Sequence, residues 1–191
     1  MTRTRLIHIT LLFITLLSTA CADQNPAVNT LFEDIQNRLS LMKEVAAYKW
    51  ETDSPIEVKE RETIVLKATL QAAEDNGVDP STAKSFFEEQ IEVAKSIQRA
   101  WHKHWEENSF DDAFEGRDIA KIRVEISTLG KAIIVAMPQA LPSLHNAANE
   151  AHYRQIFFQT IDTDYVTDDD KERLFSSLVN IQLKHSAKDE L

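Results

Sequence analysis

The sequence predicts an all-α protein, a single-domain bundle of about six helices, and three observations support that prediction. Apolar residues recur at steps of three and four along most of the chain, and no window alternates with period two for long enough to predict a strand. Three glycines and five prolines in 191 residues are too few turn formers for a many-stranded β fold. With 43% hydrophobic residues the chain can build a core, and its length suits one domain.

Six helices are expected after residue 22, and most are marked by a start or stop signal. Ser54-Pro55-Ile56-Glu57 and Asp79-Pro80 each place a capping side chain before a proline at the first helical position. Thr167 and Asp170 form a capping box, and Pro138 is expected to stop a helix. The expected helices cover approximately residues 28–52, 54–76, 79–106, 118–137, 142–161 and 167–187.

Residues 1–22 are expected to be a secretory signal peptide, which leaves residues 23–191 as the mature helical domain. A positive start with Arg3 and Arg5 precedes the apolar run LIHITLLFITLL, and Ala20-Cys21-Ala22 provides a small-x-small cleavage pattern. The run is short for a membrane span, so no membrane association is expected after cleavage. Lipid attachment at Cys21 and an uncleaved anchor are the two alternatives. The protein is expected to be exported, to the periplasm or the medium.

The composition excludes several classes of function. A formal net charge of −10 argues against binding to nucleic acid or anionic membranes, because both need clustered Lys and Arg. Three glycines cannot supply a dinucleotide fingerprint or a P-loop, and one cysteine excludes an internal disulfide and a Cys-based zinc site. No metal site is expected, because His102 and His104 are two apart on a helix and point to different faces. Residues 188–191 spell KDEL, which is either a eukaryotic retention signal or a chance ending.

Cationic and amide side chains interrupt the expected apolar helix faces. Arg38 and Lys49 interrupt the first helix, Arg61 the second, Gln98 the third and Arg123 the fourth. Each alone is explained by a side chain that reaches the rim, meets a carboxylate or is satisfied in the core. No comparable set of Asp or Glu interrupts these faces, and buried unpaired cations are costly. The pattern predicts a pocket for a small compound with two or more carboxylates. Because the pocket contains no nucleophile–base pair, any catalysis there would work by positioning and electrostatics.

The chain also resembles the exported, all-helical chorismate mutases of the AroQ superfamily, gamma subclass. The resemblance lies in RLSLMKEVAAYKW (38–50), SPIEVKERE (54–62), GVDP (77–80), FFEEQIEVAKSIQ (86–98) and RVEISTL (123–129). It spans the mature chain in order and implies the same helical fold. It also implies the rearrangement of chorismate to prephenate for Phe and Tyr biosynthesis, a unimolecular reaction that needs no cofactor. Exported members are typically homodimers with each active site inside one chain, so a homodimer is implied here.

The resemblance implies a role for each of the five interrupting side chains. Arg38, Arg61 and Arg123 match the cationic positions that hold the substrate carboxylates. Lys49 matches a lysine that contacts the ether oxygen and a carboxylate. Gln98 matches the side chain that hydrogen-bonds the same ether oxygen.

A sixth residue and two departures complete the family comparison. Glu62 matches the carboxylate that receives the substrate hydroxyl in some relatives. Val58 stands where an aspartate is common, and Ala94 where relatives can have Ser or Thr. If that aspartate acts through its backbone little is lost, whereas if its carboxylate is needed Glu62 must do more. The alternative function is a non-enzymatic helical module that binds a small dicarboxylate metabolite through the same pocket.

Overall fold

The computed structural model describes residues 25–110 and 118–184, and it confirms the all-α class. Within these residues an isolated antiparallel bridge between Val78 and Leu183 is the only β-type pairing. The expected signal peptide, including Cys21, and the KDEL ending lie outside the described residues. No helix of the described part is long and apolar enough to cross a membrane. The helices are α1 (Pro26–Ser40), α2 (Met42–Glu51), α3 (Lys59–Asp75), α4 (Pro80–Asn108), α5 (Ile119–Leu144), α6 (Glu150–Thr160) and α7 (Asp168–Val179).

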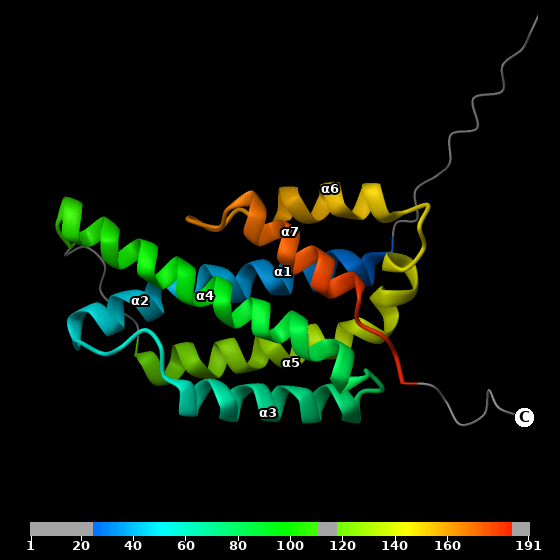
Figure 1. Cartoon of the computed structure of the whole chain (residues 1–191), viewed down its shortest axis with the longest axis horizontal. Coiled ribbons are helices and arrows are strands. Elements are labelled where there is room, and N and C mark those ends of the chain that lie inside the picture. The colour runs from blue at the N-terminus through cyan, green and yellow to red at the C-terminus, as the bar shows by residue number, and fades with distance from the viewer. Residues whose placement is uncertain (1–24, 111–117, 185–191) are drawn as a thin grey trace, which may run out of the picture.

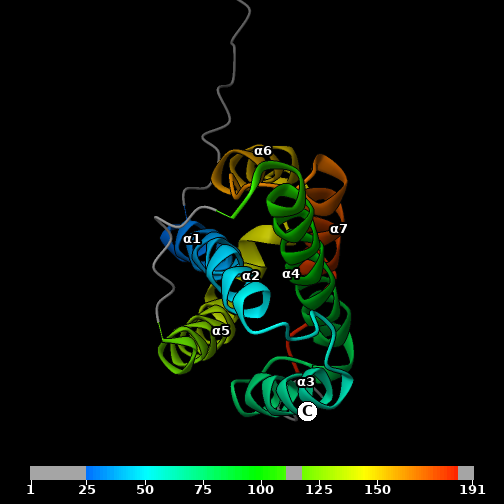
Figure 2. The ribbon, with the colours of Figure 1, turned by 90° about the vertical axis from the view of Figure 1, so that its left-hand side faces the viewer.

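The long helix α4 crosses the molecule, with α6 and α7 on one side of it and α3 and α5 on the other (Figure 1). α1 packs mainly against α5, and α2 packs mainly against α4. Seen from the end where α2 lies, α3 is across from α2, with α4 and α5 on either side (Figure 2). These four helices therefore face a common region of the molecule.

The apolar core is shared by α1, α4, α5, α6 and α7. Phe32 of α1 lies edge-on against Tyr153 and Phe157 of α6, with ring centroids 6.5 and 5.0 Å away. Phe157 in turn contacts Phe175 of α7 at 5.5 Å, and all four rings are buried. In contrast, α3 has one buried residue, Ala73. The buried core is therefore formed by the other helices, and α3 contributes little to it.

The helix expected over residues 28–52 is divided into α1 and α2 at Leu41. The Ser40 hydroxyl donates to the Asn37 carbonyl at 2.8 Å, a side-chain bond that competes with the helical ladder. The backbone of Leu41 stays near helical angles, with φ −67° and ψ −12°. The division adds one helix to the expected six.

The expectation that Pro138 ends a helix was wrong, because α5 continues through Pro138 and Pro142 to Leu144. A proline inside a helix costs about 3 kcal/mol through a lost hydrogen bond and a steric clash. Met137 and Leu141 on the same stretch are fully buried, and their packing offsets that cost. The next helix, α6, consequently begins at Glu150 and not at Pro142.

The N-terminal cap of α7 agrees with its sequence signal. The Thr167 hydroxyl accepts from the Asp170 backbone N–H at 3.1 Å, and the Asp170 carboxylate accepts from the Thr167 backbone N–H at 3.0 Å. This reciprocal pair is a capping box, and it satisfies two donors that the helix itself leaves free. α7 ends at Val179, eight residues before the expected end at 187.

Replacing the capping residue should destabilise the protein by a measurable amount. Thr167→Ala is expected to lower the free energy of unfolding by about 1 kcal/mol, because the box loses its acceptor. Thr128→Ala is the matched control: Thr128 is exposed on α5, and its hydroxyl only donates back to the Val124 carbonyl. That change should stay within about 0.5 kcal/mol. Urea denaturation followed by circular dichroism measures both, and equal effects would contradict the cap assignment.

Candidate active site

A cavity of about 570 Å³ opens between α2, α3, α4 and α5. The end of α1 and the connection between α2 and α3 complete its lining. All six side chains expected from the sequence line this cavity: Arg38, Lys49, Arg61, Glu62, Gln98 and Arg123. They come from five different helices, so the fold brings together residues that are far apart in the chain.

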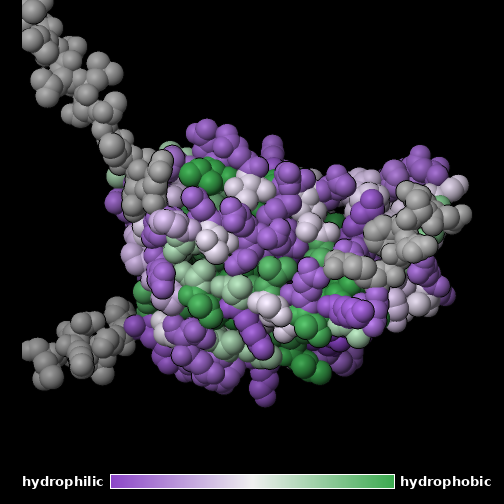
Figure 3. All heavy atoms as spheres, turned by 180° about the vertical axis from the view of Figure 1, so that it is seen from behind, coloured by the Kyte–Doolittle hydropathy of each residue, from purple (hydrophilic) through white to green (hydrophobic). Residues whose placement is uncertain are grey.

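The apolar faces of α3 and of the N-terminal half of α5 form walls of this cavity. Val65 and Ala68 of α3 and Ile126 of α5 line the cavity, and Val65 is 37% exposed. Ile64 and Val124 on the same two helices are 69% and 67% exposed. Figure 3 shows apolar surface in the lower half of the molecule, where α3 and α5 lie. The apolar periodicity of α3 and α5 therefore indicates a helix face that lines the cavity.

Arg38 lies at the C-terminal end of α1, half-buried and facing the cavity. Its Nη1 donates to Oε1 of Gln90 at 3.1 Å. Burial lowers the pKa of Arg38 to about 10, so the guanidinium stays charged at neutral pH. Among the described residues no carboxylate forms an ion pair with it.

Lys49, near the end of α2, donates from Nζ to the Ile56 carbonyl at 2.7 Å. Burial, opposed by Glu62 and reinforced by the charges of Arg123 and Arg61, lowers the pKa of Lys49 to about 8. The hydrogen bond fixes one N–H of the ammonium and leaves two for a ligand. Lys49 is therefore a directed donor whose charge the surroundings disfavour.

Arg61 and Arg123 are exposed on two walls of the cavity, on α3 and α5. Burial, together with the charge of Arg123, lowers the pKa of Arg61. The Arg123 guanidinium lies 5.9 Å from the ring centroid of Tyr48, at the outer range of a cation–π contact. Neither arginine has an ion-pair partner within residues 25–110 and 118–184. The walls therefore carry like charges that an anion between them would neutralise.

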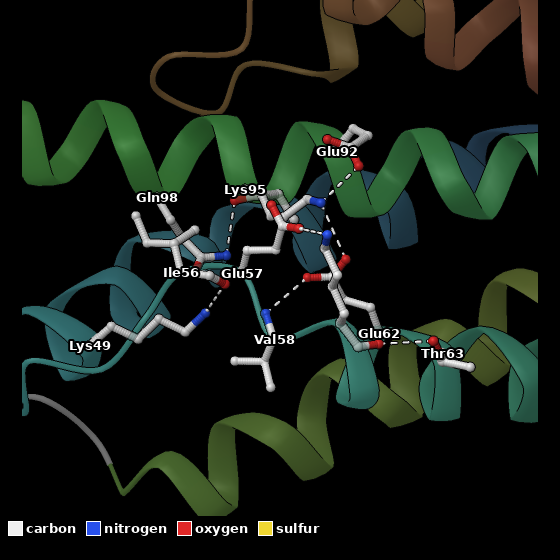
Figure 4. A network of polar contacts seen from close by, with 11 residues as sticks. Lys49, Ile56, Glu57, Val58, Glu62, Thr63, Glu92, Lys95 and Gln98 are labelled. Carbon is white, nitrogen blue, oxygen red and sulfur yellow. Dashed lines mark hydrogen bonds and ion pairs between the residues drawn. The ribbon is translucent and has the colours of Figure 1, made fainter.

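Glu62 accepts hydrogen bonds from two donors, the backbone of Val58 at the start of α3 and the side chain of Lys95 on α4 (Figure 4). Its Oε1 accepts from the Val58 backbone N–H and its Oε2 from Lys95 Nζ, both at 3.2 Å. Lys95 also pairs with Glu92 at 2.8 Å. Val58 is the N-cap of α3, so the helix begins at Lys59, and the start expected at Ser54 was wrong. The valine at this position still contributes through its backbone.

Sequence reasoning missed Lys95, which is 7% exposed and lines the cavity. Burial opposes its charge, but hydrogen bonds to Glu92 and Glu62 raise the pKa of Lys95. The spacing to Gln98 is three residues, and residues three apart share one face of a helix. That spacing was the available signal, and it links Lys95 to the face that carries Gln98.

Gln98 is 4% exposed and comes from the middle of α4. Its Nε2 donates to the Ala94 carbonyl at 3.0 Å and contacts Met42 Sδ at 3.7 Å, while Oε1 has no hydrogen-bond partner among the described residues. A thioether sulfur is a weak acceptor, so the second N–H can turn to a ligand oxygen at little cost. A glutamine donates at any pH, because the amide does not titrate.

Comparison with known proteins identifies the family. Over 152 residues the chain is 30% identical to a secreted chorismate mutase of Yersinia pestis, across 78% of this chain and 79% of that protein. The chain belongs to the chorismate mutase family. Residues 29–99 match the family model for chorismate mutase type II, a range that contains every expected site residue except Arg123.

Two further similarities extend over most of the chain. A monofunctional chorismate mutase of Enterobacter agglomerans is 29% identical over 159 residues, across 83% of this chain and 86% of that protein. The crystal structure of secreted chorismate mutase from Yersinia pestis has a TM-score of 0.74 at 28% identity, and the match covers 81% of this chain and 98% of that chain. The resemblance to exported AroQ chorismate mutases is confirmed at the level of the family and the all-α fold.

Removing Lys95 should loosen α3 in this chorismate mutase. Lys95→Met leaves one oxygen of Glu62 without its donor, and α3 has little buried surface to hold it otherwise. Backbone amides of residues 58–70 are expected to exchange with deuterium about tenfold faster, which corresponds to about 1.4 kcal/mol. Hydrogen exchange with mass spectrometry measures this rate. Lys103→Met is the control, because Lys103 is exposed on the same helix and pairs only with Glu107. Unchanged protection of α3 in Lys95→Met would contradict the role assigned to the lysine.

Proposed function

We propose that this cavity converts chorismate to prephenate, an isomerase reaction of Phe and Tyr biosynthesis. The observation that carries the proposal is the set of cations around one cavity: Arg38, Lys49, Arg61 and Arg123. Within the described residues none of them has an ion-pair partner. Chorismate has two carboxylates, and charge-assisted hydrogen bonds to guanidinium groups would bind both. The missing negative charge would then come from the substrate.

The arginines would select the reactive conformer of the substrate. Chorismate rearranges when its enolpyruvyl side chain folds over the ring, which fixes the distance between the two carboxylates. Arg38, Arg61 and Arg123 stand on three different helices, so they can hold two carboxylates at a fixed separation. Holding reacting atoms in position removes entropy cost before the chemical step. One C–O bond breaks and one C–C bond forms within the same molecule, so the protein contributes no covalent step.

Lys49 and Gln98 would stabilise the transition state at the ether oxygen. Negative charge grows on that oxygen as the C–O bond breaks, and preorganised donors bind it more strongly then than in the ground state. Removing one such donor costs about 3–4 kcal/mol in comparable oxyanion sites. Glu62, with both oxygens oriented by Val58 and Lys95, would accept the hydroxyl of the ring.

We also propose that the enzyme acts outside the cytoplasm, as a homodimer. Residues 1–22 would be removed as a signal peptide, leaving residues 23–191. The secreted relative of Yersinia pestis supports export. Each site would lie within one chain, because Arg123 of the second half completes the lining formed by the first half. The site of action would be the periplasm or the surrounding medium, and the enzyme would belong to the gamma subclass.

Purified residues 23–191 should deplete chorismate, which is followed by its ultraviolet absorbance. Lys49→Ala is expected to lower kcat at least about 100-fold, because the ether oxygen loses a charged donor. His104→Ala should not change kcat, because His104 contacts the rings of Trp101 and Tyr165 and does not line the cavity. Chorismate bound without turnover by the wild-type protein would favour the alternative, a non-enzymatic binding module.

The pH profile should reflect Lys49. In the enzyme without substrate, Lys49 donates as an ammonium below its pKa of about 8 and loses that charge above it. Because kcat/KM reports groups of the free enzyme, it is expected to be level between pH 5 and 7 and to fall above pH 8. Gln98 adds no titration in this range. Stopped or continuous assays in buffers of constant ionic strength measure the profile, and a steep fall between pH 5 and 7 would count against both assignments.

A further inference from the structure

Gln90 is a buried polar residue that the proposed mechanism does not use. It lies on α4, is 0% exposed and does not line the cavity. Its Oε1 accepts from Nη1 of Arg38 at 3.1 Å, and of the two residues Arg38 is the one that lines the cavity. Its Nε2 has no hydrogen-bond partner within the described residues. An amide kept in the core with neither of its N–H groups hydrogen-bonded requires a reason.

The chemistry of the pair supplies that reason. A guanidinium that must be held in place is usually held by a carboxylate, which forms short charge-assisted bonds but cancels the positive charge. An amide oxygen accepts the same N–H and fixes its direction, but it carries no net charge. Arg38 therefore keeps its whole charge for whatever enters the cavity.

We propose that Gln90 is a positioning residue of this chorismate mutase, a neutral acceptor that aims Arg38 into the cavity without neutralising it. This inference rests on the proposed function, because it assigns Arg38 to a substrate carboxylate. The residue acts through Arg38 and touches no substrate atom. Its contribution is to substrate affinity more than to the rate of the chemical step.

Gln90→Glu separates orientation from charge, because it keeps the acceptor and the size but adds a negative charge. The glutamate is expected to form an ion pair with Arg38, so the KM for chorismate should rise about tenfold or more, with a smaller fall in kcat. The melting temperature should be retained. Gln155→Glu is the matched control, because Gln155 is exposed on α6 and the change adds the same charge away from the cavity. Its KM should equal that of the wild type.

A second pair of variants tests the route through Arg38. In an Arg38→Met background, adding Gln90→Glu should raise KM no further, because the group that the glutamate neutralises is gone. If glutamate prevents folding, Gln90→Met keeps the size and removes the acceptor, and KM should again rise with kcat less affected.

The outcomes are distinct from a failure of the proposed function. If the wild type and Gln155→Glu do not turn over chorismate, the proposed function fails. If both turn over and Gln90→Glu folds with a KM within threefold of the wild type, the role of Gln90 is overturned. An equal rise of KM with and without Arg38 also overturns it, because Gln90 would then act through another group.

Discussion

The arrangement depends on holding like charges close together without a built-in counter-ion. Lys49, Arg61 and Arg123 face one cavity. Burial lowers the pKa of Lys49 to about 8, and the charges of Arg123 and Arg61 add to this shift while Glu62 opposes it. Repelling groups on flexible segments would move apart. Lys49 and Arg123 stay because α2 and α5 bury apolar residues in the core, whereas Arg61 stands on α3, which buries only Ala73 among its described residues. The free energy of core packing thus offsets the repulsion between these cations.

The same constraint explains why the protein is acidic while its cavity is basic. The formal net charge is −10, yet among the described residues that line the cavity Glu62 is the one carboxylate beside several cations. That carboxylate is already engaged by the Val58 amide and by Lys95, so it neutralises little of the charge of the arginines. Net charge describes the outer surface of this protein. A polyanion meets that surface, whereas a small dicarboxylate can enter the cavity.

Local signals were sufficient for the helical class and for the cap at Thr167, because caps and periodicity depend on neighbouring residues alone. They failed at Pro138, where burial of Met137 and Leu141 outweighs the cost of a proline. Periodicity also could not separate core from cavity wall on α3, because an apolar face looks the same whichever it meets. The six expected site residues line one cavity, as the cations on the apolar helix faces predicted. The hydrogen-bond partners of these residues were not predictable. Lys95 and Gln90 contact Glu62 and Arg38 across helices, and only tertiary packing sets those pairs.

Three polar residues of α4 have different effects on the charged groups of the site. Gln90 directs Arg38 and leaves its charge intact, Lys95 orients the carboxylate of Glu62, and Gln98 offers a donor that does not titrate. A charged group in place of either glutamine would make the field of the cavity depend on pH or on an internal ion pair. With two amides, neither of these positions adds a titrating group to the site. A reaction that needs only an oriented substrate and a positive field at one oxygen can proceed in a site with few titrating groups.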